Sequence, residues 1–190
     1  MSSTRIRLAA LGATLLGALA LAAPAQATDT TAAQSRAAFS AQAHEAGLND
    51  GQAAELQRQV DAQLAATGGR QIAANKIALD KDAKAVLLLP LPGEQRARDL
   101  SAPGAPYDTC KRDKICLYPY TNFNGTALQV FDCGKVSNPF RGTGSWINNQ
   151  PSGYRMSFYD HNGKFGWGSK YGYDERAEAP LDWFGYISAC

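Results

Sequence analysis

Cysteine placement constrains this chain more than any other feature of its sequence. All four cysteines lie in the last part of the chain, from Cys110 to Cys190. The aromatic residues follow the same distribution, because Phe39 is the only one before Tyr107. Such a composition is typical of a small β-rich domain in which disulfides supplement a modest core. We therefore expect a domain over residues 106–190, preceded by a linker that contains Pro and Gly.

The first 27 residues have the three parts of a secretory signal peptide. Arg5 and Arg7 supply the positive charge, an apolar run follows over residues 8–22, and residues 25–27 read Ala-Gln-Ala, a small-residue cleavage site. The apolar run is shorter than the ~20 residues that span a membrane. We expect a secreted, extracellular protein with no membrane-spanning segment after cleavage, whose cysteines meet an oxidising environment.

Four cysteines allow three pairings. We favour Cys110 with Cys116 and Cys133 with Cys190, since the second bridge would tie the final residue to the middle of the domain. By loop entropy the short bridge contributes about 2 kcal/mol and the long one about 4 kcal/mol. No Cys-x-x-Cys pair or Cys/His cluster with zinc spacing occurs, which indicates a structural role for all four.

Residues 28–105 are rich in Ala and Gln and predict a small α+β unit with a thin core. Asn49 is a suitable N-cap for the second helix, with Gln52 as its capping-box partner. Because the unit has few large apolar side chains, we expect a pro-segment or spacer that docks through the apolar run 86–89. The predicted elements are helices over 33–46 and 50–66, then a hairpin of strands 71–79 and 84–91 with its turn at 80–82.

Residues 106–190 predict an all-β sandwich of short strands. Apolar and polar residues alternate in strand-like segments, and clusters of Asn, Gly, Ser and Pro between them predict turns. The predicted strands cover 115–118, 128–131, 156–159 and 183–189, and the predicted turns cover 122–125, 142–145, 148–151 and 162–163.

Tyr118, Phe123 and Gly125 have the spacing of a folded aromatic corner: two aromatic rings that pack together, then a glycine in a conformation closed to other residues. This spacing resembles the Greek-key signature of βγ-crystallin domains. A second copy is expected near Tyr159, where Phe165 and Gly166 do not have the matching spacing.

The segment from about residue 107 to 190 is also similar to a family of secreted actinobacterial peptidase inhibitors, the microbial metalloproteinase inhibitor type. The resemblance implies a βγ-crystallin-like Greek-key sandwich and inhibition of an extracellular peptidase, a metalloprotease in particular. It is carried by residues 115–118, residues 122–125, Cys133, residues 144–150 and Cys190.

One candidate ligand is calcium, which some βγ-crystallin domains bind through a short motif of Asn, Asp, Ser and Thr. Residues 148–153 resemble this motif, with Asn148, Asn149 and Ser152 as the expected ligands. Their amide and hydroxyl oxygens suit a hard cation. The alternative is an Asn-rich turn whose side chains bond to nearby backbone. No other cofactor is expected.

Phe165, Trp167 and Tyr171 are candidate contacts for a protein or glycan partner, because aromatic side chains exposed on a loop suit such binding. The alternative is that these rings alternate into the core. The formal net charge of +2 comes from Arg5 and Arg7 in the predicted signal peptide, so the remainder is neutral. We therefore expect no nucleic-acid partner.

The sequence offers little for catalysis. It has two histidines, His44 and His161, and no Gly-x-Ser-x-Gly motif. The acidic residues Asp174, Glu175 and Glu178 are expected on a solvated segment rather than in a paired-carboxylate site. We predict a secreted peptidase inhibitor that is not an enzyme, with a calcium- or glycan-binding extracellular module as the alternative. The target peptidase and the oligomeric state stay open.

Overall fold

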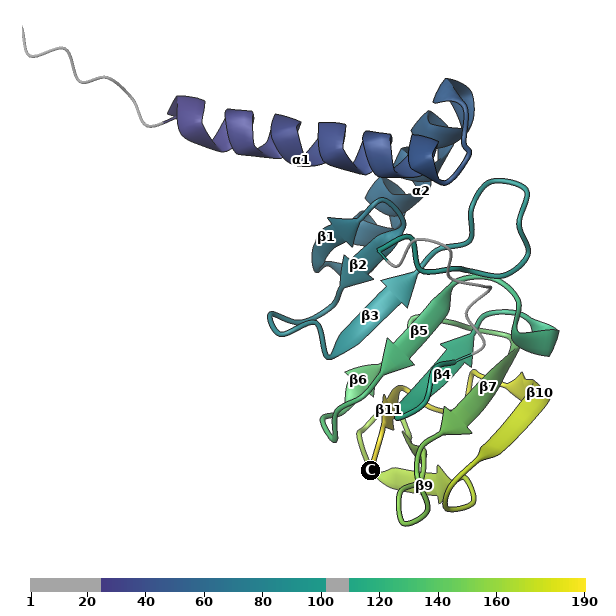
Figure 1. Cartoon of the computed structure of the whole chain (residues 1–190). Helices are drawn as coiled ribbons and strands as arrows, with labels where there is room; N and C mark the ends of the chain where they lie inside the picture. The colour runs from purple at the N-terminus through teal and green to yellow at the C-terminus, as the bar shows by residue number, and fades with distance from the viewer. Residues whose placement is uncertain (1–24, 102–109) are drawn as a thin grey trace, which may run out of the picture.

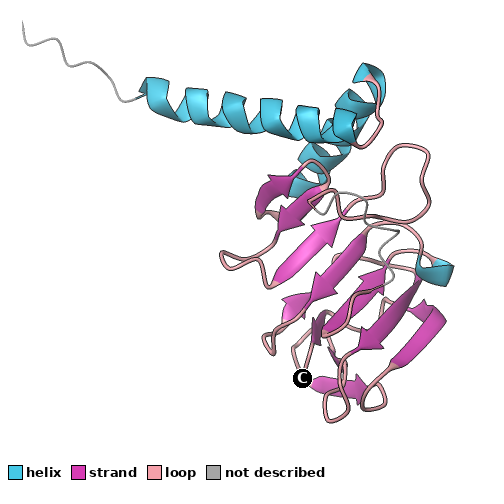
Figure 2. Ribbon diagram, viewed as in Figure 1, coloured by secondary structure: helices cyan, strands magenta, loops and turns pink. Residues whose placement is uncertain are grey.

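The computed structural model describes the backbone of residues 25–101 and 110–190, with side chains from residue 33 onward in these ranges (Figures 1 and 2). Most of the predicted signal peptide and the predicted boundary at residue 105 lie outside the described residues. The described elements are α1 (Ala25–Glu45), α2 (Asp50–Thr67), β1 (Arg70–Ala73), β2 (Lys76–Ala78), β3 (Ala85–Leu88), β4 (Lys114–Tyr118), the 3-10 turn η1 (Thr121–Phe123), β5 (Ala127–Val130), β6 (Val136–Ser137), β7 (Thr143–Asn149), β8 (Ser157–Tyr159), β9 (Phe165–Gly168), β10 (Asp174–Pro180) and β11 (Tyr186–Ser188).

The strands form two antiparallel sheets. The first has the order β1-β2-β3-β5-β4-β7-β10, and the second has the order β6-β11-β8-β9. Two strands lie in a different sheet from the strands next to them in the chain. Strand β6 lies in the second sheet, whereas β5 and β7 lie in the first, and β10 lies in the first sheet, whereas β9 and β11 lie in the second. One hydrophobic core includes Ile115 and Trp146 from the first sheet with Phe158 and Ile187 from the second. The predicted β-rich, disulfide-containing C-terminal region is thus confirmed at the level of two antiparallel sheets.

The prediction of turns at 142–145 and 148–151 is wrong, because most of these residues form β7, which lies between β4 and β10. Gly144 is needed there for close approach rather than for a turn. A Cβ at this position would lie 2.2 Å from the carbonyl oxygen of Tyr118 and 2.5 Å from Cδ1 of Leu181. Glycine usually indicates a turn, but Gly144 allows two strands to pack closely.

The predicted strand over 71–79 is also wrong as a single element, because a turn at residues 74–75 divides it into β1 and β2. Asn75 is buried in this turn, and its Nδ2 donates to the carbonyl oxygens of Leu89 at 2.7 Å and Arg98 at 2.8 Å. Two helices and the β2–β3 hairpin are present as predicted. The capping box of Asn49 and Gln52 at the start of α2 is confirmed.

Strand β3 joins the two compositionally different regions into one sheet. It pairs antiparallel with β5 along its whole length, from Ala85 opposite Val130 to Leu88 opposite Ala127. The prediction that residues 86–89 dock this region is confirmed. Leu87 and Val60 of α2 also belong to the same core as Leu128 and Val130. The change in composition near residue 105 therefore does not interrupt the sheet (Figure 1).

Polar contacts extend this junction on both sides of β3. Nζ of Lys84 lies 3.1 Å from a carboxylate oxygen of Asp132. Further along the chain, the backbone N–H of Gly125 donates to the carbonyl oxygen of Gln95 at 2.7 Å, and Arg96 donates to the carbonyl oxygen of Asn122 at 2.9 Å. The chain before the linker therefore holds β5 and the turn that precedes it.

We predict that a proteolytic cut between Leu100 and Tyr107 leaves the two pieces associated. Separation would expose the hydrogen-bonding edge of β5 and the apolar contacts of β3, both of which are costly in water. In size-exclusion chromatography the nicked protein should elute as one species and separate only in denaturant. Elution of the C-terminal piece as a separate folded protein in buffer would contradict this expectation.

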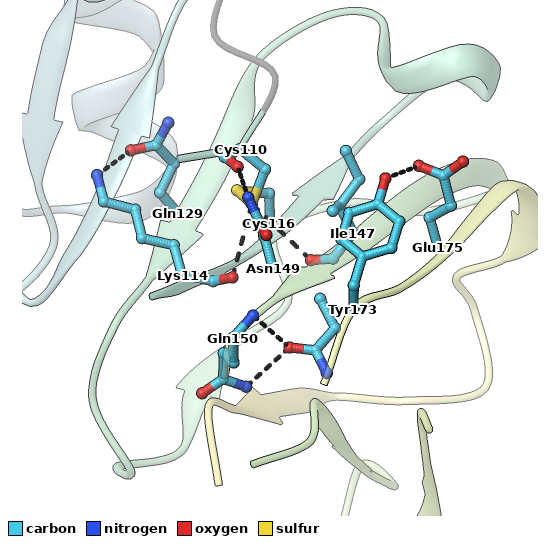
Figure 3. Close-up of a disulfide and its surroundings, with 10 residues drawn as sticks. Cys110, Lys114, Cys116, Gln129, Ile147, Asn149, Gln150, Tyr173 and Glu175 are labelled. Carbon is cyan, nitrogen blue, oxygen red and sulfur yellow. Dashed lines mark hydrogen bonds between the residues drawn. A yellow bond between two sulfur atoms is a disulfide. The ribbon is translucent and has the colours of Figure 1, made fainter. Parts of the chain in front are cut away.

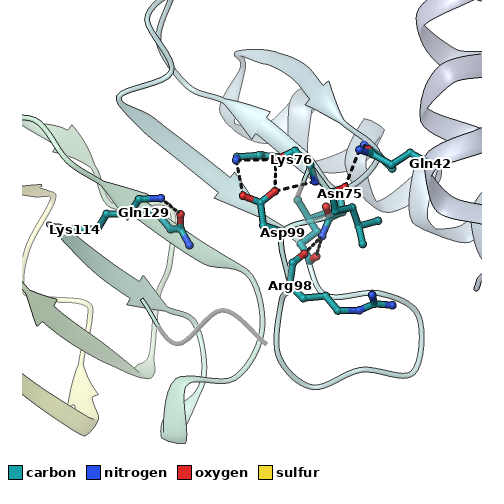
Figure 4. Close-up of polar contacts among 11 residues, drawn as sticks. Gln42, Asn75, Lys76, Arg98, Asp99, Lys114 and Gln129 are labelled. Atoms are coloured by element: carbon teal, nitrogen blue, oxygen red, sulfur yellow. Dashed lines mark hydrogen bonds and ion pairs between the residues drawn. The ribbon is translucent and has the colours of Figure 1, made fainter. Parts of the chain in front are cut away.

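An ion pair fixes the segment that follows β3 to the hairpin. Nζ of Lys76 lies 2.8 Å from Oδ2 of Asp99, whose side chain is only 8 % exposed, and Ser101 donates to Oδ1 of the same carboxylate (Figure 4). Burial alone would raise the pKa of Asp99. The hydrogen bonds from Lys76 and Ser101, together with the charge of Lys76, outweigh burial and lower this pKa below its ordinary value.

We predict that Asp99→Asn lowers the free energy of unfolding by about 3 kcal/mol at pH 7, because Lys76 loses its partner in a mostly buried position. A carboxyl with a lowered folded-state pKa stabilises the protein above its unfolded pKa, and this stabilisation disappears as pH falls through the folded pKa. The difference between wild type and variant in urea unfolding should therefore shrink toward pH 2. The exposed Asp61→Asn is the control, and a pH-independent difference would refute the ion-pair explanation.

Candidate binding surface

The aromatic corner predicted from the sequence is present at the end of β4. The rings of Tyr118 and Phe123 pack edge to face with centroids 5.8 Å apart. Gly125 follows with φ +88°, and a Cβ there would lie 2.7 Å from Cγ of Pro119 and 2.8 Å from Cδ2 of Tyr120. Glycine is therefore required at this position by both backbone conformation and space.

Sequence reasoning missed the residue that holds this corner closed. Ser145 on β7 accepts a hydrogen bond from the backbone N–H of Phe123 at 2.9 Å and donates one to the carbonyl oxygen of Tyr120 at 2.6 Å. Ser145 reaches the corner because it lies opposite Tyr118 in the β4–β7 ladder. No local pattern signals this role, since it depends on a strand pairing between distant segments.

We predict that Gly125→Ala lowers the free energy of unfolding by about 2 kcal/mol, because the added methyl group meets Pro119 and Tyr120 and strains a positive-φ backbone. Gly134→Ala is the matched control, since a Cβ there has nothing within 4 Å and the backbone does not have positive φ. The control should stay within about 0.5 kcal/mol of wild type in urea unfolding. Equal effects at the two positions would contradict the packing argument.

Both disulfides have the favoured pairing. Cys110 and Cys116 are joined with a Cα–Cα distance of 5.8 Å, and Cys133 and Cys190 with a distance of 4.9 Å. The first bridge is buried beside β4, whereas the cysteines of the second are exposed.

Two of the three residues predicted to bind calcium, Asn148 and Asn149, make hydrogen bonds within the protein. Asn148 is buried in β7, where its Nδ2 donates to the carbonyl oxygen of Gly172 at 2.7 Å and its Oδ1 accepts from Nε2 of Gln150 at 2.9 Å. Asn149 donates to the carbonyl oxygen of Cys110 at 2.7 Å (Figure 3). Ser152 is exposed. Calcium binding by these residues stays a prediction, and a cation would have to replace the contacts of the Asn148 oxygen.

The acids and histidine considered for catalysis do not form a cluster of the kind that holds a metal. His161 is exposed, with Nε2 2.8 Å from the carbonyl oxygen of Asp182. On β10, Glu175 accepts a hydrogen bond from the hydroxyl of Tyr173, and this bond raises the pKa of Tyr173 to about 12. Over residues 25–101 and 110–190, no group of three or more His, Cys, Asp or Glu side chains is placed to hold a metal ion.

Most of the exposed aromatic side chains lie in one stretch of the chain, between Tyr154 and Trp183, and we call this group the aromatic surface. Its strand β9 lies at the opposite end of the molecule from α1 (Figure 1). Phe165, Trp167 and Tyr171 belong to it, so the alternative that these three rings fill the core is wrong. The aromatic surface comprises Tyr154, Phe165, Trp167, Tyr171, Tyr173 and Trp183, whereas Tyr120 and Phe131 are exposed elsewhere.

Guanidinium groups hold parts of the aromatic surface in place. Cζ of Arg155 lies 5.1 Å from the ring centroid of Phe165 and 5.3 Å from that of Tyr171. Phe165 also packs edge to face on Tyr159 at 5.9 Å. The second aromatic corner, whose spacing does not match the signature, thus still brings its two rings together.

Comparisons with known proteins add no relative. No family model, curated protein or solved structure gives a significant match to the chain. Within the described part of the chain, no helix is both long enough and apolar enough to cross a membrane.

Proposed function

We propose that the chain is an exported protein of βγ-crystallin-like Greek-key class that binds an extracellular peptidase and inhibits it. On this proposal it acts by covering a partner's surface and has no catalytic step. The identity of the partner rests on the resemblance of residues 107–190 to secreted peptidase inhibitors. The two disulfides are consistent with an oxidising, extracellular environment.

Two features support the Greek-key part of the proposal. Strand β6 lies in the sheet of β8, β9 and β11, and β10 lies in the sheet of β4, β5 and β7. Each half of residues 110–190 thus contributes one strand to the sheet formed by the other half. The closed corner of Tyr118, Phe123 and Gly125 is the packing that the Greek-key signature implies.

The proposed binding function rests on the aromatic surface. Large aromatic side chains exposed together are costly in water and are enriched, with Arg, at the centres of protein interfaces. Here several such rings lie in one region of the chain, and Arg155 and Arg176 each stack on one or two of them. Such a surface can fill the cleft of an enzyme by shape and by apolar contact.

We predict that the purified mature chain reduces the activity of at least one secreted metalloprotease in stoichiometric amounts. A panel of metallo- and serine peptidases should be titrated with the protein, and the residual hydrolysis of a peptide substrate measured. Inhibition that ends at one equivalent is expected, whereas no loss of activity across the panel would refute the proposal.

Two matched variants locate the interface. Tyr171 and Tyr120 are both 64 % exposed, but only Tyr171 belongs to the aromatic surface. Tyr171→Ala should weaken inhibition about tenfold or more, as expected for a central interface aromatic. Tyr120→Ala should leave inhibition unchanged, and the reverse order would place the interface outside the aromatic surface.

A further inference from the structure

All three tryptophans of the chain line one groove. Two cross-strand pairs build it, one from each sheet: Trp146 lies opposite Arg176 in the β7–β10 ladder, and Phe158 lies opposite Trp167 in the β8–β9 ladder. Trp183, in the segment before β11, forms the other wall. The groove has a volume of about 230 Å³, and its remaining lining residues are Ala179, Pro180 and Phe184.

The groove is formed in advance of any ligand. Its floor consists of buried rings, including Trp146 and Phe158, while Trp167 is 39 % exposed and Trp183 is 40 % exposed. Trp183 packs against Phe158 at 5.9 Å and lies over the backbone of β9, where a Cβ on Gly166 would be 2.8 Å from its Cζ3. Rings held by such contacts present fixed faces to the solvent, which lowers the ordering cost of binding.

A single positive charge borders these faces. Arg176 is the one charged residue of the lining, and its Cζ lies 5.7 Å from the ring centroid of Trp167. It forms no ion pair with another described residue. A ligand for this groove therefore needs a flat face for the indoles and a negative group for the guanidinium.

We propose that the groove binds one pyranose ring of an acidic polysaccharide, a uronic acid unit. The C–H face of the sugar would stack on the indole rings, whose faces carry negative charge density, and the carboxylate would pair with Arg176. The volume suits one six-membered ring, and an open groove leaves the sugar hydroxyls in water. An apolar side chain of a protein partner would not use the charge of Arg176. The proposal shares the aromatic surface with the proposed function but does not require peptidase inhibition.

The test uses the intrinsic fluorescence of the full mature chain, because every tryptophan lines the groove. Three probes should be titrated: oligogalacturonate, the same oligomer with its carboxyls methyl-esterified, and oligoglutamate. We expect a saturable fluorescence change with oligogalacturonate, at least tenfold weaker binding of the neutral ester, and no saturable change with oligoglutamate. Equal binding of the ester, equal binding of oligoglutamate, or no response to oligogalacturonate would each overturn the proposal.

Two variants separate the contribution of Arg176 from general charge. Arg176→Gln changes an exposed side chain and should reduce oligogalacturonate affinity to that of the ester. Arg112→Gln, also exposed but outside the groove, should bind like wild type. Equal loss in both variants would indicate non-specific attraction and would refute the site. The result is distinct from that of the peptidase panel, because sugar binding without inhibition refutes only the proposed function, and inhibition without sugar binding refutes only the groove.

Discussion

Backbone pairing between β3 and β5 joins two regions of unlike composition into one seven-stranded sheet. Without β3, the edge of β5 would present unpaired N–H and C=O groups to water, and the core that includes Leu87 and Leu128 would lose one of its walls. The Ala-rich region has a small core of its own, which includes Leu48, Leu56 and Leu91, but Val60 and Ile77 belong to the core that it shares with β5. The contacts of Gln95 and Arg96 around Gly125 extend the dependence to the aromatic corner.

A shared core, two exchanged strands and a disulfide hold the two sheets together. Their shared core contains side chains from both, and the exchanged strands β6 and β10 anchor each half of residues 110–190 in the sheet of the other half. The bridge from Cys133 to Cys190 fixes the end of the chain beside the segment between β5 and β6. This support leaves β9 and the segment before β11 free to present Trp167 and Trp183 on a rigid base, which is the condition for a preformed binding groove.

Local patterns were sufficient for the features that depend on neighbouring residues. The capping box at Asn49, the turn at 80–82 between β2 and β3, and the aromatic corner of Tyr118, Phe123 and Gly125 could all be predicted, because each depends on contacts within a few residues. Strand β7 could not be predicted, since Gly144 and Asn148 have the composition of a turn and are used for close packing and buried hydrogen bonds. The groove was missed for a related reason. Trp146, Trp167 and Trp183 lie on separate segments, and only the pairing of strands in two sheets brings them together.

Strand β3 precedes β5 in the chain, and this order affects how the sheet can assemble. During synthesis the N-terminal elements emerge first, so the apolar strand β3 exists before β5 has been made. In that interval the shared core already has Ile77 of β2 and Val60 of α2, with Leu64 and Leu79 partly buried against it. The early helix–hairpin unit then presents an open strand edge to the residues that follow. The Ala-rich region can therefore act as a template to which the disulfide-bonded region adds its strand β5.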